Sequence, residues 1–153
     1  MPKPQSDAVR DLLLNALDYA FDKRSWHGPN LTGAIRGVDS KTAAKRLPGR
    51  KCIWEQVLHA AYWKQAIINK LTGVSERLPR RGSNWPAMPD RVDAAAWRAD
   101  VQLLHDVHRR LRATVVDRDA TAFDAKTRWL IQGAAAHDLY HAGQIKLLRR
   151  LVA

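Results

Sequence analysis

The sequence predicts an all-α fold, a four-helix bundle with long crossover connections, formed by residues 1–153 as a single domain. Three observations lead to this class. A chain of 153 residues, of which 46% are apolar, is long enough to bury one core and too apolar for wholesale disorder. Four long segments repeat apolar residues at intervals of three and four, the spacing of one helix face. No segment shows the alternation of apolar and polar residues that indicates a half-buried strand.

Each of the four segments carries its own apolar face. The expected helices span residues 6–23, 52–71, 91–116 and 123–151. Their faces comprise Val9, Leu13 and Leu17; Ile53, Val57 and Ala60; Trp97, Val101, Leu104 and His108; and Leu130, Ala134, His137 and His141. In the third helix the apolar positions alternate by four and three residues, as in the seam of a helical bundle. Gly73 is a favourable residue for the end of the second helix.

Two long connections join the first three helices. Residues 26–51 and 74–90 are rich in glycine and proline, which mark turns. Residues 39–46 could form a short helix inside the first connection. Loops of this length in a small domain are often functional, for example as the cover of a cavity. The alternative is that they only bridge distant helix ends in a bundle with crossover topology.

Composition limits the compartment and the partners. No apolar run reaches the roughly eighteen residues that a membrane helix needs, and residues 1–7 lack the apolar centre of a signal peptide. The single cysteine, Cys52, cannot form an internal disulfide, which fits a reducing compartment. We therefore expect a cytoplasmic protein without a membrane partner. The net charge of +11 could attract nucleic acid, anionic lipid or an acidic substrate, but we favour a role in solubility.

The sharpest motif in the chain is a pair of histidines four residues apart, His137 and His141. Residues at this spacing differ by about 40° in direction on a helix, so both imidazoles can point at one ion. Both lie on the apolar stripe between Ala134 and Ile145, where an unpartnered imidazole would be costly to bury. A metal ion or a set of hydrogen bonds would satisfy them. Asp138 stands where a zinc protease helix has its glutamate, so that enzyme's general-base geometry does not follow.

A third histidine, His59, lies in the middle of the second expected helix. Residues 53–63 around it, together with residues 137–145, resemble the DinB-like family, also called the YfiT-like metalloenzymes. The segments 26–31 and 84–86 are similar to that family as well, so the resemblance spans nearly the whole chain in the right order. The family pattern commonly has arginine where this chain has Ala142, so a role carried by that arginine does not transfer.

The resemblance implies a four-helix bundle, often a homodimer, in which His59, His137 and His141 bind one divalent metal ion, with zinc, nickel and iron all possible. Three protein ligands leave at least one coordination position open. Some family members transfer or isomerise with a low-molecular-weight thiol, whereas others resemble hydrolases. Our leading hypothesis is a metal-dependent enzyme, such as a thiol S-transferase that acts on an electrophilic substrate. The alternative is a non-catalytic module that binds a metal or a small molecule.

Further residues are candidates for the surroundings of the metal. Glu55 precedes His59 by one helical turn and could orient its imidazole, although a solvated glutamate is an equal alternative. Gln144 could hydrogen-bond near the cavity or lie on the surface. His27 could line the cavity mouth, but a loop histidine is more often exposed. His108 could be a fourth ligand, although we favour a buried and hydrogen-bonded role.

Nucleic-acid binding is the third hypothesis. Basic clusters occur at residues 45–51, 77–81, 109–112 and 149–150. No recognisable nucleic-acid motif accompanies them, and positive charge is favourable at helix C-termini for structural reasons. We therefore expect no specific nucleic-acid partner.

Overall fold

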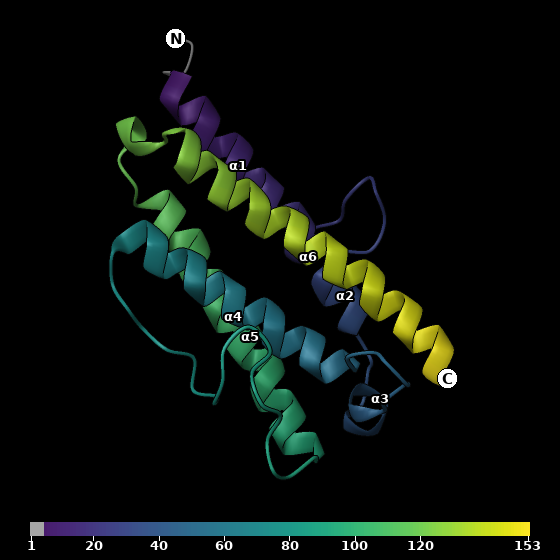
Figure 1. The fold of residues 1–153 in the computed structure, drawn as a ribbon. Coiled ribbons are helices and arrows are strands. Elements are labelled where there is room, and N and C mark those ends of the chain that lie inside the picture. The colour runs from purple at the N-terminus through teal and green to yellow at the C-terminus, as the bar shows by residue number, and fades with distance from the viewer. Residues whose placement is uncertain (1–4) are drawn as a thin grey trace.

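The fold is all-α, as predicted. A computed structural model describes residues 5–153, with side chains described from Ala8 onward. The helices are α1 (Gln5–Phe21), α2 (Leu31–Ile35), α3 (Ser40–Ala44), α4 (Ile53–Thr72), α5 (Ala94–Val116), a 3-10 helix η1 (Ala120–Ala122) and α6 (Ala125–Val152) (Figure 1). Apart from an isolated bridge between Ser25 and Gly28, the described residues contain no β-structure.

The four long helices occur within a few residues of their expected bounds, whereas α2 was not predicted. Helix α2 begins because the side chain of Asn30 accepts a hydrogen bond from the backbone N–H of Gly33. A Cβ at Gly33 would lie 2.9 Å from Oδ1 of Asn30, so this cap needs the glycine. Five residues are too few to show helical periodicity, and the glycine alone suggested a turn. The expected short helix at residues 39–46 is confirmed as α3.

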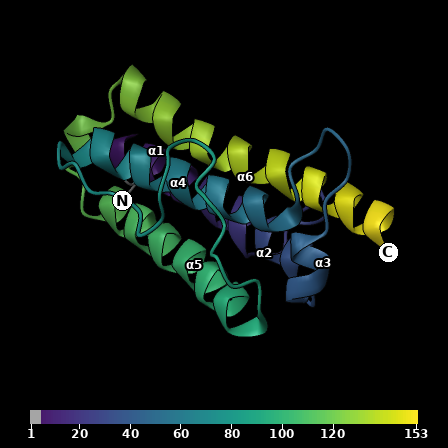
Figure 2. The same ribbon diagram turned by 60° about the horizontal axis from the view of Figure 1, so that its bottom comes forward.

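Contacts between the long helices show which of them are parallel and which are antiparallel. Arg10 at the start of α1 binds the carbonyl of Arg118 beyond the end of α5, and Phe21 at the end of α1 stacks on His108 in the middle of α5, so these helices are antiparallel. Helices α4 and α5 run in the same direction, and α6 runs against both (Figures 1 and 2). Parallel neighbours require the chain to return along a full helix, which explains the long connection at residues 73–93.

Helix α4 is the most enclosed element of the fold. Every side chain from Cys52 to Ala61 is buried, and the helix packs against α5 on one side and α6 on another. Gly73 ends it in the left-handed conformation, with φ of 76°, as expected for a helix C-terminus. Because α4 also carries polar residues on its buried surface, each of them requires a partner inside the protein.

The core is continuous along the four long helices. It is built from apolar side chains that include Leu13, Leu17, Trp54, Leu58, Leu104, Leu111, Ile131, Ile145 and Leu148. Among the described residues, no helix combines the length and the apolar character that crossing a bilayer requires.

Candidate metal centre

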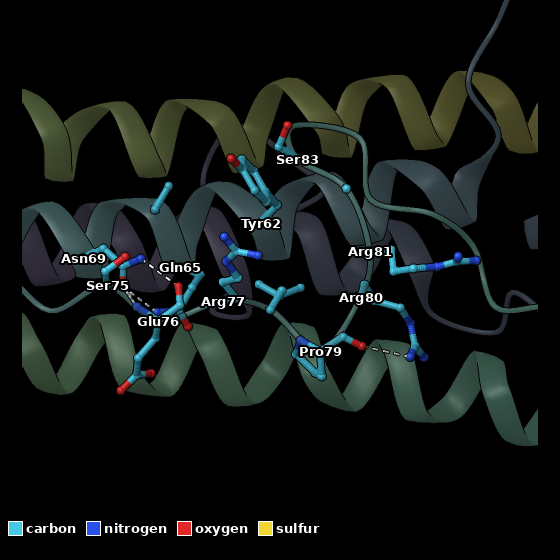
Figure 3. Close-up of a pocket in the computed structure, with 13 residues that line it drawn as sticks. Tyr62, Gln65, Asn69, Ser75, Glu76, Arg77, Pro79, Arg80, Arg81 and Ser83 are labelled. Atoms are coloured by element: carbon cyan, nitrogen blue, oxygen red, sulfur yellow. Dashed lines mark hydrogen bonds between the residues drawn. The ribbon is translucent and has the colours of Figure 1, made fainter.

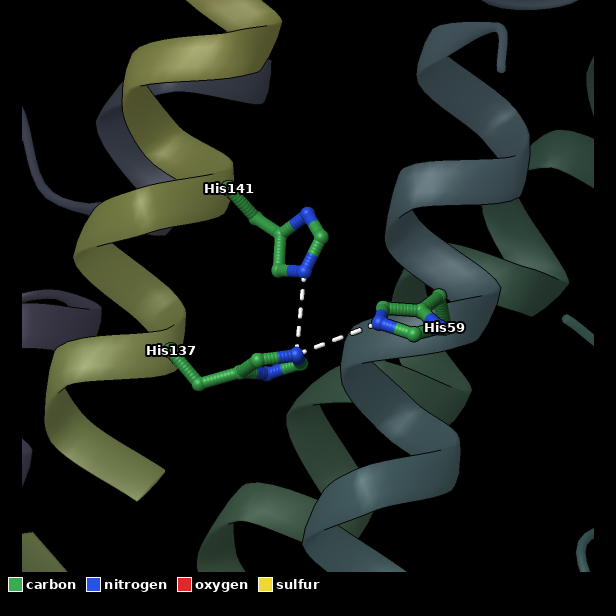
Figure 4. Close-up of side chains that lie close together, drawn as sticks. All are labelled: His59, His137 and His141. Atoms are coloured by element: carbon green, nitrogen blue, oxygen red, sulfur yellow. Dashed lines mark hydrogen bonds between the residues drawn. The ribbon is translucent and has the colours of Figure 1, made fainter. Parts of the chain in front are cut away.

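Three histidines from two antiparallel helices meet between α4 and α6. Nε2 of His137 lies 3.1 Å from Nε2 of His59 and 3.0 Å from Nε2 of His141 (Figure 4). The two histidines of α6 point the same way because they are four residues apart, and His59 faces them across the helix interface. His59 and His141 are buried and His137 is half-buried. The three side chains lie close enough together to hold one metal ion.

The tautomers of two of these histidines follow from their partners. Nδ1 of His59 lies 2.6 Å from the backbone carbonyl oxygen of Asn84, and Nδ1 of His141 contacts Oε1 of Gln56. Since both partners are acceptors, each Nδ1 carries the proton and donates it. Each Nε2 is therefore left with a lone pair directed at His137. Orientation of a metal-binding histidine through its other ring nitrogen is the usual arrangement around protein metal sites.

All three imidazoles are held in the neutral form that binds metals. Burial lowers the pKa of His59, although the hydrogen bond to Asn84 opposes this. Burial and then the nearby His59 and Lys64 lower the pKa of His137 to about 4. Burial and then the neighbouring His137 and His59 lower the pKa of His141 to about 3. At neutral pH the cluster is therefore uncharged and available to a cation.

The donor set fits a divalent transition metal. Nε2 of His137 carries at most one proton, so at most one of its two close contacts with a neighbouring Nε2 can be a linear hydrogen bond. A cation at this point would accept all three lone pairs at once. Three imidazole nitrogens are ligands that zinc, nickel and iron(II) all accept, and they leave room for a further ligand.

Residues of the connection between α4 and α5 cover the histidine cluster. Trp85 stacks on the ring of His59, with 3.8 Å between ring centres and 16° between planes. Asn84 has φ of 60°, in the left-handed region that an asparagine tolerates better than most residues. Its side-chain oxygen accepts a hydrogen bond of 2.9 Å from Nε1 of Trp63. Thus the backbone carbonyl of Asn84 orients His59, and the side chain of Asn84 stabilises the backbone conformation that places this carbonyl.

The same connection is anchored at two further points. The guanidinium of Arg80 lies 2.5 Å from Asp100 of α5, and Nε1 of Trp54 donates to the other oxygen of that carboxylate. Nδ2 of Asn69 donates to the backbone carbonyl of Glu76 at 2.8 Å. These contacts attach an irregular segment to α4 and α5, so it can hold Asn84 and Trp85 over the histidines.

A small cavity of about 300 Å³ opens over the cluster. All three histidines line it, and so do Gln56 and Trp85. Gln144, a candidate from the sequence, also lines this cavity and is half-buried. The cavity gives a fourth ligand or a substrate access to the point where the three nitrogens meet.

Three candidates from the sequence take other positions. The carboxylate of Glu55 does not orient His59, because it accepts hydrogen bonds from the backbone of Cys52, from Arg46 and from Lys51 at the start of α4. His27 is exposed on the loop after α1 and is not among the residues that line the cavity. The fourth-ligand role considered for His108 does not fit its position.

His108 belongs to a separate polar cluster in the protein core. Its Nδ1 lies 3.2 Å from the ammonium of Lys64, and its ring stacks on Phe21 at 3.6 Å. Lys64 also forms an ion pair of 2.5 Å with Asp138, and both side chains are almost fully buried. Burial and then the positive charge of Lys64 lower the pKa of His108 to about 2. The favoured expectation of a buried, hydrogen-bonded histidine agrees with this arrangement.

The partners of the histidines are the residues that sequence reasoning missed. Gln56 was not among the candidates from the sequence, although it lies three positions before His59, one turn away on α4. Asn84 was noted only within a segment similar to the family, and its contact with His59 spans 25 residues. Contacts between a loop and a helix leave no periodic signal in a sequence.

A larger hollow of about 820 Å³ lies farther along α4, beneath the connection to α5. Its lining comes from α4, with Tyr62, Gln65 and Asn69, and from residues 75–83 of the connection (Figure 3). None of the three clustered histidines lines it. Size alone therefore does not identify the chemical site, and the smaller cavity over the histidines is the candidate.

No protein-family model, no curated protein and no solved structure matches this chain. The fold and the cluster define an all-α protein in which three histidines lie close enough to hold a metal ion.

Proposed function

We propose that the protein is a metal-dependent enzyme of the DinB-like type, with a four-helix bundle that binds one divalent ion through His59, His137 and His141. The single observation that carries this proposal is the convergence of three neutral Nε2 atoms, two of them with their Nδ1 protons already committed to oxygen acceptors. Such a cluster is costly to bury without a cation and well suited to one.

The reaction that we propose is transfer of a low-molecular-weight thiol to an electrophilic substrate. A divalent ion with an open position supplies Lewis acidity and favours the ionised form of a bound thiol or water. Among the described residues, no carboxylate lines the cavity, and Asp138 is paired with Lys64 in the core. The lining of the cavity, as far as the structure describes it, thus has no carboxylate general base of the kind that hydrolytic zinc helices use, which supports thiol transfer over hydrolysis.

Elemental analysis of untagged protein tests the metal site. We expect close to one zinc, nickel or iron per chain, and loss of that metal in His137→Ala. His27→Ala is the matched control, because it removes an exposed histidine outside the cavity and should leave the metal content unchanged. Wild-type protein that neither contains metal nor takes it up on reloading would contradict the proposal.

A conjugation assay then tests the catalytic part. Metal-loaded and metal-free protein are compared with a panel of low-molecular-weight thiols and electrophiles, and we expect turnover only in the loaded form. Stoichiometric metal without turnover on any pair would favour the second candidate, a non-catalytic metal-binding or small-molecule-binding module.

We also propose a homodimer that packs through α6. Four large apolar side chains on this helix are exposed, and their spacing of eleven, seven and four residues places them on one stripe: Trp129, Tyr140, Leu147 and Leu151. Exposed apolar stripes of this kind mark interaction surfaces. Tyr140 and Leu147 also line the cavity over the histidines, so the partner would lie beside the site.

A further inference from the structure

The cavity over the three histidines has an uneven distribution of charge. Arg50 and Lys51, from the connection before α4, line it, and none of its lining residues is acidic. Lys51 lies 3.3 Å from Glu55, which is also paired with Arg46. Within the described residues, the guanidinium of Arg50 has no ion-pair or hydrogen-bond partner and is free to bind a ligand.

The ion expected at the cluster would add to this positive charge. Three neutral imidazoles leave the charge of a divalent ion without compensation, whereas a cysteine or carboxylate ligand would offset part of it. A ligand in the cavity would therefore be near the ion, Arg50 and Lys51 at once. In a partly buried site such charges favour an anion and disfavour a cation.

The remaining wall of the cavity is apolar and aromatic. Trp85, Tyr140, Leu147 and Leu148 form it, and the ammonium of Lys51 lies 5.3 Å from the ring centre of Trp85. The cationic and apolar parts thus adjoin each other at Trp85. A volume of about 300 Å³ is at the lower end of the range of ligand cavities, so the ligand is small.

We infer that this site takes a small amphipathic carboxylate, whose negative group binds Arg50 and Lys51 while its apolar part lies against Trp85 and the leucines of α6. This inference rests on the proposed function and adds to it the chemical class of the substrate. Arg50 is the residue that selects for charge, because it lines the cavity and its side chain is otherwise uncommitted.

Three unbranched six-carbon probes that differ in charge test the inference: hexanoate, hexanol and hexylammonium. Their binding to zinc-loaded and metal-free protein is measured by calorimetry and by chemical-shift changes. We expect hexanoate to bind most tightly and hexylammonium least in both forms, because Arg50 and Lys51 remain when the metal is removed. Equal binding of the three probes, or no binding of hexanoate, would overturn the inference.

Matched charge variants separate a specific contact from general attraction. Arg50→Gln should weaken hexanoate binding about five- to tenfold, the usual effect of losing a partly exposed charged contact, and leave hexanol unchanged. Arg81→Gln removes the same charge from an exposed position outside the cavity and should have little effect. Equal losses in both variants would mean that only the net charge matters, which overturns the role of Arg50.

The metal content of each sample keeps this inference distinct from the proposed function. Protein that binds no zinc but prefers hexanoate contradicts the metal site and supports the anion site. Protein that binds zinc but does not distinguish the probes supports the metal site and contradicts the anion site.

Discussion

Nδ1 of His59 donates a hydrogen bond to the backbone carbonyl of Asn84 over 2.6 Å, and this contact joins a buried helix to an irregular loop. The acceptor is a main-chain atom, so its position depends on the backbone conformation of Asn84 and on whatever stabilises that conformation. We therefore expect a side chain of the loop to influence the proposed metal site through the backbone of Asn84, without itself bonding to any of the three histidines.

Substitutions at Asn84 should change metal affinity in a graded way. Asn84→Ala removes the acceptor for Trp63 and places alanine at a φ of 60°, which costs on the order of 1 kcal/mol. We expect about a tenfold loss of zinc affinity, the lower end of the effect of removing an outer partner of a metal ligand. Competition with a chromogenic chelator measures it.

Asn84→Gly is the control for backbone strain. Glycine adopts positive φ freely, so this variant loses only the Trp63 contact and should bind zinc more tightly than Asn84→Ala. Identical affinities for wild type and both variants would show that the loop carbonyl does not orient His59.

The ion pair between Lys64 and Asp138 should be a major determinant of stability. Both groups are almost fully buried, so Lys64→Met alone leaves an unpaired carboxylate in the core, at a cost of about 3–5 kcal/mol. The double variant Lys64→Met with Asp138→Leu removes both charges and should recover most of that loss. Urea unfolding of metal-free protein measures the three free energies.

Arg109→Met serves as the matched control for this pair. Arg109 and Asp106 form an ion pair on the exposed face of α5, and such pairs contribute little to stability. If Lys64→Met and Arg109→Met shift the unfolding free energy equally, the buried pair has no special role.

Acid should destabilise the protein well above the range in which carboxylates titrate. The pKa of His108 is about 2 in the fold and 6.5 in the reference state, so the unfolded chain binds more protons between these values. The contribution of neutral, buried His108 to the unfolding free energy is therefore fully present above pH 6.5. It is lost progressively as the pH falls from 6.5 towards the pKa of His108 in the fold. Each buried histidine whose pKa is lowered in this way should decrease the unfolding free energy by up to about 1.4 kcal/mol for each pH unit of acidification.

His108→Gln isolates the contribution of this residue. The variant removes one titrating group, so its unfolding free energy should decrease less steeply between pH 6 and 4.5, by up to about 1.4 kcal/mol per pH unit. Only the slope is compared, so a change in absolute stability does not affect the result. Parallel slopes for wild type and variant would mean that buried His108 is protonated in the fold.

The proposed dimer predicts a concentration-dependent mass. Trp129 is 69% exposed on the apolar stripe of α6 and is not among the residues that line the cavity. Trp129→Glu should shift wild-type dimer to monomer in analytical ultracentrifugation while leaving the zinc content unchanged. A monomeric wild-type protein at high concentration would contradict the dimer without affecting the metal site.

The fold was largely predictable because helix faces repeat along the chain. Val57 and Leu104 lie at positions whose burial the periodicity indicates directly, and both are buried. The pair His137 and His141 is local in the same sense, so helix geometry predicted that they share a direction. Their proximity to His59 depends on how α4 and α6 pack, and the sequence suggested it only through family resemblance.

Other features depend on contacts that no local pattern records. The carboxylate of Glu55 accepts a hydrogen bond from the backbone N–H of Cys52, as in a helix-capping box. The sequence did not indicate this capping box, because its N-cap residue is cysteine and not the usual serine or threonine. Lys64 was not among the residues whose burial the sequence indicated, yet it lies in the core, where it forms an ion pair with Asp138 and lies 3.2 Å from Nδ1 of His108. Such partnerships become visible only when helices from different parts of the chain meet.

The segment that covers the histidines is a connection between helices and not a helix itself. The residence time of a bound ion can therefore differ from the lifetime of the folded protein. We expect residues 73–93 to open locally while the helices remain packed, once Arg80 releases Asp100, Asn69 releases Glu76, and Asn84 releases Trp63 and His59. The residence time of a bound ion would then follow the opening of this segment, not the global unfolding rate. Stabilising the core would leave metal exchange unchanged, whereas loosening the Arg80 contact would accelerate it.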